Sequence, residues 1–124
     1  MSNLLMSSGA VLAALAVAAG AYASHGLKQH VSPEKVEVFR TGVDYHIYHA
    51  IGMVLVGLLL AHRPSLAGKS AGILFFVGIL LFSVNIYISC LTDWRGLSRL
   101  NPVGGMAFIA GWICFAVAAY RHVE

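Results

Sequence analysis

The sequence predicts an all-α fold: an integral membrane bundle of four helices, with a short amphipathic helix in the membrane interface between the first two. Hydrophobic residues make up 59% of the 124-residue chain and charged residues only 10%, whereas about 25% of the residues of a soluble domain are charged. The apolar residues also gather in four stretches that are long enough to cross a bilayer. The whole chain, residues 1–124, is therefore expected to form a single membrane domain.

Each predicted span is an apolar run close to the ~20 residues that a transmembrane helix needs. The runs do not alternate in polarity, as the strands of a membrane barrel do. The four spans cover approximately residues 4–23, 45–61, 70–91 and 103–120.

The first span could be read as a signal peptide, because "AYA" before Ser24 resembles a cleavage site. The opening segment "MSNLLMSSGA" has no lysine or arginine, however, and the apolar run is longer than a signal peptide requires. We therefore expect a retained first helix. Small residues recur along it at steps of three and four, a pattern that lets another helix approach closely. They are Ser7, Ala10, Ala14, Ala18 and Ala21.

The polar joint after the first span carries the start signals of a helix. Ser32 is a suitable N-cap, and Pro33 occupies the first helical position. A helix over residues 33–61 would be about 43 Å long, which exceeds the ~30 Å hydrocarbon core. We therefore expect a short amphipathic helix in the interface that bends near Gly42 into the second span. Its apolar residues repeat at helical spacing: Val36, Phe39 and Val43.

The distribution of cations predicts the orientation, because cytoplasmic loops carry an excess of lysine and arginine. Five cations lie on the side of the joints 24–44 and 92–102, and three lie on the side of the termini. The five are Lys28, Lys35, Arg40, Arg95 and Arg99, and the three are Arg63, Lys69 and Arg121. The count favours both termini outside. No basic block is present, so the sequence indicates no nucleic-acid partner, and membrane lipids are the expected one.

Polar side chains within the spans gather at one membrane face. In an up-down-up-down bundle, the ends of the first and third spans meet the starts of the second and fourth. The candidate polar cluster at this face consists of His25, Tyr45, His49, Asn85 and Tyr87. Hydrogen bonding between helices is the ordinary role of such groups, whereas ionisable residues inside a membrane can also mark a functional pathway.

Three kinds of ligand are compatible with this cluster. His46 and His49 are three residues apart on a helix and, with Asp44 and His25, could ligate a metal ion, although no H-E-x-x-H motif is present. Haem ligation by His25 and His49 is disfavoured because both lie near the interface. A lipid headgroup or a quinone could also occupy the cluster.

No arrangement typical of catalysis is present: there is no Ser-His-Asp or Cys-His set, phosphate loop or acid pair. Cys90 and Cys114 lie in apolar segments and are expected to be free thiols. We therefore predict no catalytic residue, metal ligand or cofactor, and no enzymatic activity. Gly104 and Gly105 in "NPVGGM" are expected to serve close helix packing.

Four segments resemble, in order and spacing, the membrane-protein family catalogued as domain of unknown function 423, which includes YgdD- and YwdK-like bacterial proteins and is related to transmembrane protein 256. They are "GAYASHGLK", "TGVDYHIYHAIGMVLVGLLL", "FSVNIY" and "NPVGGMAFIAGW". His46 and Asn101 depart from the family pattern, which has glutamine and threonine there. The resemblance implies a multi-span protein of the bacterial inner membrane with no established activity.

The sequence thus predicts a structural or accessory membrane protein. Its partners are expected to be membrane lipids and either a second copy of itself or a larger membrane complex. The alternative is the binding of a lipid headgroup, quinone or metal at the polar cluster led by His25 and His49.

Overall fold

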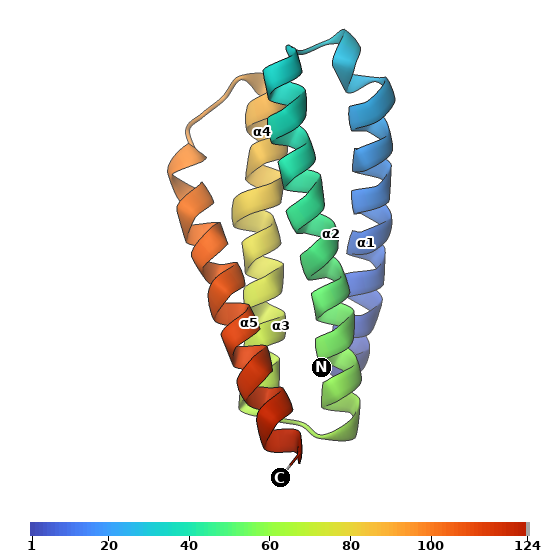
Figure 1. Ribbon diagram of the computed structural model, residues 1–124, viewed down its shortest axis with the longest axis vertical. Coiled ribbons are helices and arrows are strands. Elements are labelled where there is room, and N and C mark those ends of the chain that lie inside the picture. Colours follow the sequence, from blue (N-terminus) through green and yellow to red (C-terminus); the bar gives the residue numbers. More distant parts are fainter. Residues whose placement is uncertain (124) are drawn as a thin grey trace.

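The computed structural model describes residues 1–123 as a bundle of helices that run up and down side by side (Figure 1). No strand occurs in this part of the chain. The long helices are α1 (Ser2–His25), α2 (Pro33–His62), α3 (Leu66–Gly78), α4 (Asn85–Thr92) and α5 (Asn101–Val123). The short segments are η1 (Leu27–Gln29), η2 (Ile79–Val84) and η3 (Ser98–Leu100). The predicted all-α fold is confirmed.

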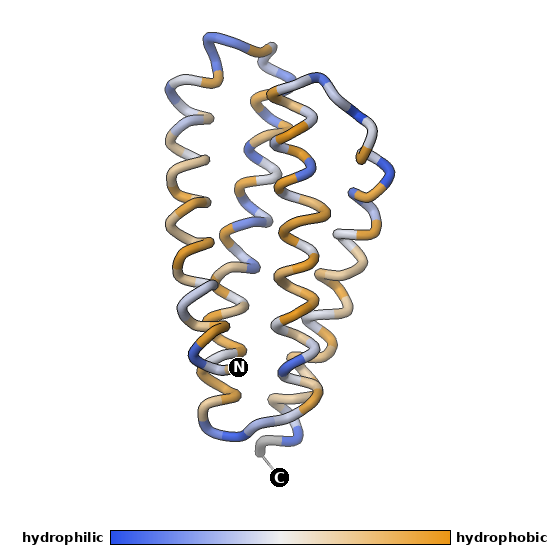
Figure 2. The backbone as a smooth tube through the Cα atoms, turned by 180° about the vertical axis from the view of Figure 1, so that it is seen from behind, coloured by the Kyte–Doolittle hydropathy of each residue, from blue (hydrophilic) through white to orange (hydrophobic). Residues whose placement is uncertain are grey.

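Four helical segments are long and apolar enough to cross a membrane, and each contains one predicted span. They cover Ser2–Gln29, Pro33–His62, Leu66–Thr92 and Ser98–Arg121. Apolar residues dominate the middle of the bundle, and hydrophilic residues gather at its two ends (Figure 2). This distribution is the one that a bilayer requires of a protein that spans it.

The separate interfacial helix expected before the second span is not formed. Instead, α2 runs as one helix of 30 residues from Pro33, with the Ser32 hydroxyl accepting a hydrogen bond from the Lys35 amide as the predicted N-cap. Val36 and Phe39 are buried in a cluster with residues of α1 and α4. Because these apolar side chains pack on neighbouring helices, the start of α2 lengthens the bundle rather than lying flat on the membrane.

The helices form an open arrangement in which α2 is central. α1 packs almost entirely against α2, and α5 packs mainly against α3, so that α1 and α5 lie at opposite edges (Figure 1). In the most apolar stretch of each segment, only 17% of the α1 residues are buried, against 44% of the α2 residues. α1 is therefore the helix that the bundle covers least.

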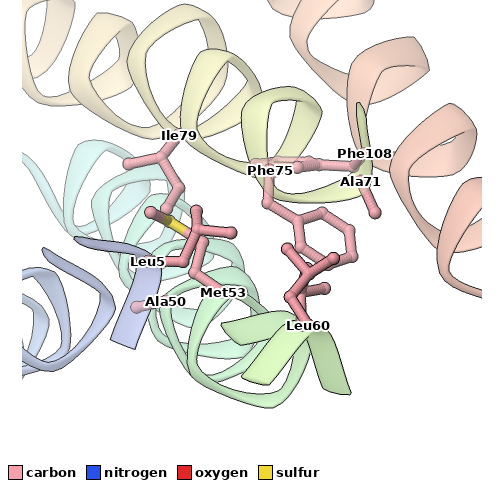
Figure 3. Close-up of a cluster of buried hydrophobic side chains, with 9 residues drawn as sticks. Leu5, Ala50, Met53, Leu60, Ala71, Phe75, Ile79 and Phe108 are labelled. Carbon is pink, nitrogen blue, oxygen red and sulfur yellow. The ribbon is translucent and has the colours of Figure 1, made fainter. Parts of the chain in front are cut away.

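The main core joins all four membrane-spanning helical segments, in the part of the bundle toward the start of α1 and the end of α2. Leu5 of α1 and Met53 of α2 meet Phe75 of α3, Ile79 of η2 and Phe108 of α5 (Figure 3). Phe75, Met53 and Ile79 are almost fully buried. A second cluster near the start of α2 contains Ala23 and Leu27 beside Phe39 and Ile86.

The third membrane-spanning segment, Leu66–Thr92, consists of α3, η2 and α4, and its middle part η2 is a π-helix. Such π-helical segments are rare and frequently occur at functional sites. Here Ser83 is fully buried and donates a hydrogen bond from Oγ to the Gly42 carbonyl of α2 at 2.7 Å. The next side chain back, Phe82, lies between α2 and α5. η2 thus contacts both α2 and α5.

The two glycines of "NPVGGM" have different surroundings, and the prediction that both serve packing is wrong for one of them. A Cβ atom on Gly104 would lie 2.8 Å from the Phe82 backbone nitrogen and 2.9 Å from the Leu81 carbonyl carbon. A Cβ atom on Gly105 would meet nothing within 4 Å. Gly104 lets α5 approach η2, whereas Gly105 faces open space.

Candidate functional site

His49 lies at the centre of a group of aromatic side chains between α2 and α5. It is 3% exposed, and both of its ring nitrogens have partners. The indole N–H of Trp112 points to His49 Nε2 at 3.0 Å, and His49 Nδ1 is 2.6 Å from the Tyr45 carbonyl oxygen. Because an indole can only donate and a carbonyl can only accept, Nε2 accepts and Nδ1 donates. The two partners thus fix one neutral tautomer of His49.

The His49 ring is also held by stacking. The Phe108 ring lies parallel to it with centroids 3.5 Å apart and planes inclined by 10°. The Tyr45 ring is nearly parallel to both, at 7° to His49 and 16° to Phe108. Tyr45 and His49 lie four residues apart, on one face of α2, which explains why their side chains point the same way.

A groove of about 660 Å³ borders this group, between α2 and α5. Its aromatic wall consists of Tyr45, Tyr48, Phe82, Phe108 and Trp112, with His49 among them. The exposed side chains of Tyr48, Met106 and Ile109 lie at its rim, so the groove opens on the surface of the bundle that faces lipid. Its volume is that of a small-molecule site.

His46 forms a separate contact on another side of α2. Its Nδ1 is 2.9 Å from the Tyr87 hydroxyl of α4, and the Tyr87 ring packs against Phe39 with centroids 4.6 Å apart. His46 Nε2 is buried and makes no hydrogen bond. The contact joins α2 to α4.

Asn85, at the start of α4, links this helix to the start of α5. Its side-chain amide donates to the Leu97 carbonyl at 2.5 Å and to Asn101 Oδ1 at 2.6 Å. Asn85 is buried at 5% exposure. The pair of asparagines therefore fixes the loop that leads from α4 into α5.

The five residues of the predicted cluster therefore divide among four places. Tyr45 and His49 lie together at the groove, Tyr87 pairs with His46, and Asn85 pairs with Asn101. His25 is exposed at the end of α1 and has no hydrogen bond or ion pair in the described part of the chain.

Sequence reasoning missed three residues that build the groove: Phe82, Phe108 and Trp112. A tryptophan inside an apolar span is a usable signal, because a buried indole N–H requires an acceptor. No group of three or more histidine, cysteine or acidic side chains that could hold a metal ion occurs among residues 1–121, whose side chains the structure describes. Cys90 and Cys114 are both free thiols.

Comparisons with known proteins agree with the resemblance seen in the sequence. Residues 19–105 match the family model described as "Protein of unknown function (DUF423)". The chain is 43% identical over 117 residues to the UPF0382 membrane protein YwdK of Bacillus subtilis strain 168, covering 93% of this chain and 94% of that protein. It is 34% identical over 115 residues to the UPF0382 membrane protein SH2409 of Staphylococcus haemolyticus, covering 93% of each. No solved structure matches the chain.

Proposed function

The chain belongs to the DUF423 family of unknown function, and we propose that it is a structural or accessory protein within a membrane. The relatives reported above are named membrane proteins. The use of its polar side chains supports this proposal. Most of the hydrogen bonds that His46, His49, Ser83 and Asn85 make join one helix to another or to a loop. Groups engaged in this way stabilise a fold, and His49, with both ring nitrogens hydrogen-bonded, is not free to transfer protons or ligate metals. The proposal therefore includes no catalytic step.

The outward face of α1 is the surface through which we propose that the protein associates with another membrane helix. α1 packs on α2 through Leu5, Gly9, Ala16 and Ala23, which are buried. The stripe of small residues found in the sequence points the other way, and every member is exposed: Ser7, Ala10, Ala14, Ala18 and Ala21. Small residues at this spacing let two helix backbones approach closely in lipid.

The Ser7 hydroxyl at one end of this stripe also favours a packing role over a catalytic one. It donates to the backbone carbonyl of Asn3 at 2.8 Å, within α1 itself. This end of the stripe is therefore weakly polar, because its hydroxyl is already hydrogen-bonded within α1. The partner is expected to be a second copy of the chain or a helix of a larger complex.

The test is the mass of the particle released from native membranes in polymer nanodiscs, measured by native mass spectrometry. We expect the wild-type particle to contain a second protein chain, and Ala14→Leu to lose it because the larger side chain separates the helices. Ala116→Leu on the exposed face of α5 is the matched control and should retain the partner. A wild-type particle with one chain, or an Ala14→Leu particle that keeps its partner, contradicts the proposal.

We place the protein in the bacterial plasma membrane with both termini outside, because its relatives are bacterial and cations are in excess at the end of the bundle where α1 connects to α2 and α4 connects to α5. A C-terminal alkaline phosphatase fusion should then be active. An inactive phosphatase fusion together with a fluorescent C-terminal green fluorescent protein fusion would reverse the orientation.

A further inference from the structure

The length of the α2–α5 groove matches one leaflet of a bilayer. Its lining on α5 runs from Pro102 to Trp112, eleven residues whose ten steps of 1.5 Å span about 15 Å of helix. The hydrocarbon core of a bilayer is about 30 Å thick, so the groove extends from the interface to the region of the midplane. Because it is apolar and open toward lipid, its natural occupant is a chain that lies along the bundle.

Gly105 keeps this groove open without serving the packing of the bundle. It belongs to the groove wall, and a Cβ atom there would meet nothing within 4 Å. Glycine is unfavourable in a helix by about 1 kcal/mol relative to alanine. Because no neighbouring atom requires a glycine there, the missing side chain of Gly105 leaves space beside α5 for an occupant of the groove.

A polar pocket lies near the interfacial end of the groove, because Asn101 in its wall directly precedes Pro102 in the wall of the groove. It has a volume of about 340 Å³ and is lined by residues that include Glu34, Lys35, Ser89, Arg95 and Ser98. The pocket lies between the start of α2, the end of α4 and the loop before α5. We call it the interfacial pocket.

The charges at the interfacial pocket leave a positive excess. Lys35 forms an ion pair with Asp93. Arg95 is exposed and has no carboxylate partner in the described part of the chain, and the same is true of Arg99 on the same loop. Glu34 on the pocket wall offsets one of these two charges. The guanidinium of Arg95 is thus free to bind an oxyanion, and a phosphate can accept two of its N–H groups at once.

We propose that the interfacial pocket and the α2–α5 groove together bind one phospholipid with an anionic headgroup. The phosphate contacts Arg95 in the pocket, and one acyl chain lies along Tyr45, Gly105 and Trp112 in the groove. Neither part depends on the partner-binding face of α1, which lies at the opposite edge of the bundle (Figure 1).

Trp112 provides a direct probe, because brominated acyl chains quench the fluorescence of a tryptophan that they touch. The chain has two tryptophans, so a Trp94→Phe background leaves Trp112 as the only one. The protein is reconstituted in phosphatidylcholine vesicles that contain an equal minor fraction of either brominated phosphatidylglycerol or brominated phosphatidylcholine. We expect the anionic lipid to bind about fivefold more tightly for each cation that it meets.

Variants separate the two parts of the site. Arg95→Gln should lower the preference for the anionic lipid about fivefold. Gly105→Phe should reduce quenching by both lipids, because its ring would extend into the groove from a Cβ position that meets no atom within 4 Å. The matched control is Leu58→Phe, on an exposed part of α2 outside the groove and the pocket, which should quench as the wild type does.

Circular dichroism checks that Gly105→Phe is folded, and Arg95→Gln in the exposed loop tests the headgroup contact without touching the bundle. Equal quenching by the two brominated lipids in the wild type overturns the proposal that the site prefers an anionic headgroup. Quenching that Gly105→Phe leaves unchanged overturns the acyl chain in the groove and shows that Trp112 meets only the lipid around the protein.

Discussion

The adjacent glycines Gly104 and Gly105 offer a test of the packing between α5 and η2, because the same substitution should have opposite effects. In Gly104→Ala the new methyl group would lie 2.8 Å from the Phe82 backbone nitrogen. Backbone atoms cannot rotate away as a side chain can, so α5 must shift. In Gly105→Ala the methyl group enters the groove and meets nothing.

The difference in the free energy of unfolding follows from two effects. Replacing glycine by alanine within a helix stabilises it by about 1 kcal/mol, and this gain applies to both variants. An overpacked interior costs about 1–3 kcal/mol, and this loss applies only to Gly104→Ala. We therefore expect Gly104→Ala to be less stable than Gly105→Ala by about 1–3 kcal/mol, with Gly105→Ala at least as stable as the wild type.

The assay is unfolding by denaturant in detergent micelles or bicelles, followed by circular dichroism, with both variants and the wild type measured under one condition. Because the two positions are neighbours on one helix, differences in expression, insertion and helix propensity cancel in the comparison. Equal midpoints for the two variants, or a lower midpoint for Gly105→Ala, would refute the close approach of α5 to η2 at Gly104.

Three further predictions concern the hydrogen bonds between helices. Trp112→Phe and His49→Leu, combined in a double-mutant cycle of unfolding free energies, should show a coupling of about 0.6–1.7 kcal/mol, and additive effects would contradict the bond between them. Asn85→Leu should speed hydrogen exchange in the loop before α5, because its amide holds that loop through two bonds; unchanged exchange would mean that the loop is held by other contacts. Ser83→Ala should lower the unfolding free energy by about 0.5–1.5 kcal/mol through loss of the bond to the Gly42 carbonyl, and a variant as stable as the wild type argues against that bond.

The fold was predictable from the sequence because hydropathy determines where helices cross a bilayer. In lipid, the backbone N–H and C=O groups of four such apolar runs can form their hydrogen bonds only within four helices. The predicted bend near Gly42 was wrong. It assumed that a helix longer than the hydrocarbon core must bend at the membrane interface, whereas α2 is one continuous helix. A helix can extend beyond the hydrocarbon core when its apolar residues have neighbours, and Val36 and Phe39 pack against α1 and α4.

The site was predictable only in part, because one sequence gives the depth of a residue in the membrane but not the rotation of its helix. His49 was identified as a candidate from its place in the second span, but its partner Trp112 lies 63 residues away on a helix of unknown orientation. His25 was grouped with His49 because both lie toward the same end of the bundle, but it is exposed at the end of α1 and makes no hydrogen bond in the described part of the chain.

The two edges of the bundle differ in chemistry, so each suits a different kind of partner. α1 offers a smooth stripe of small residues from Ser7 to Ala21, which suits a helix backbone. The edge at α5 offers a groove with aromatic walls and a cation at its mouth, which suits a lipid. α2 packs along α1 and also lines the groove opposite α5, so it borders both surfaces. If the two surfaces bind independently, Ala14→Leu should leave the lipid preference of the groove unchanged, whereas a change in that preference would show that α2 transmits the state of one edge to the other.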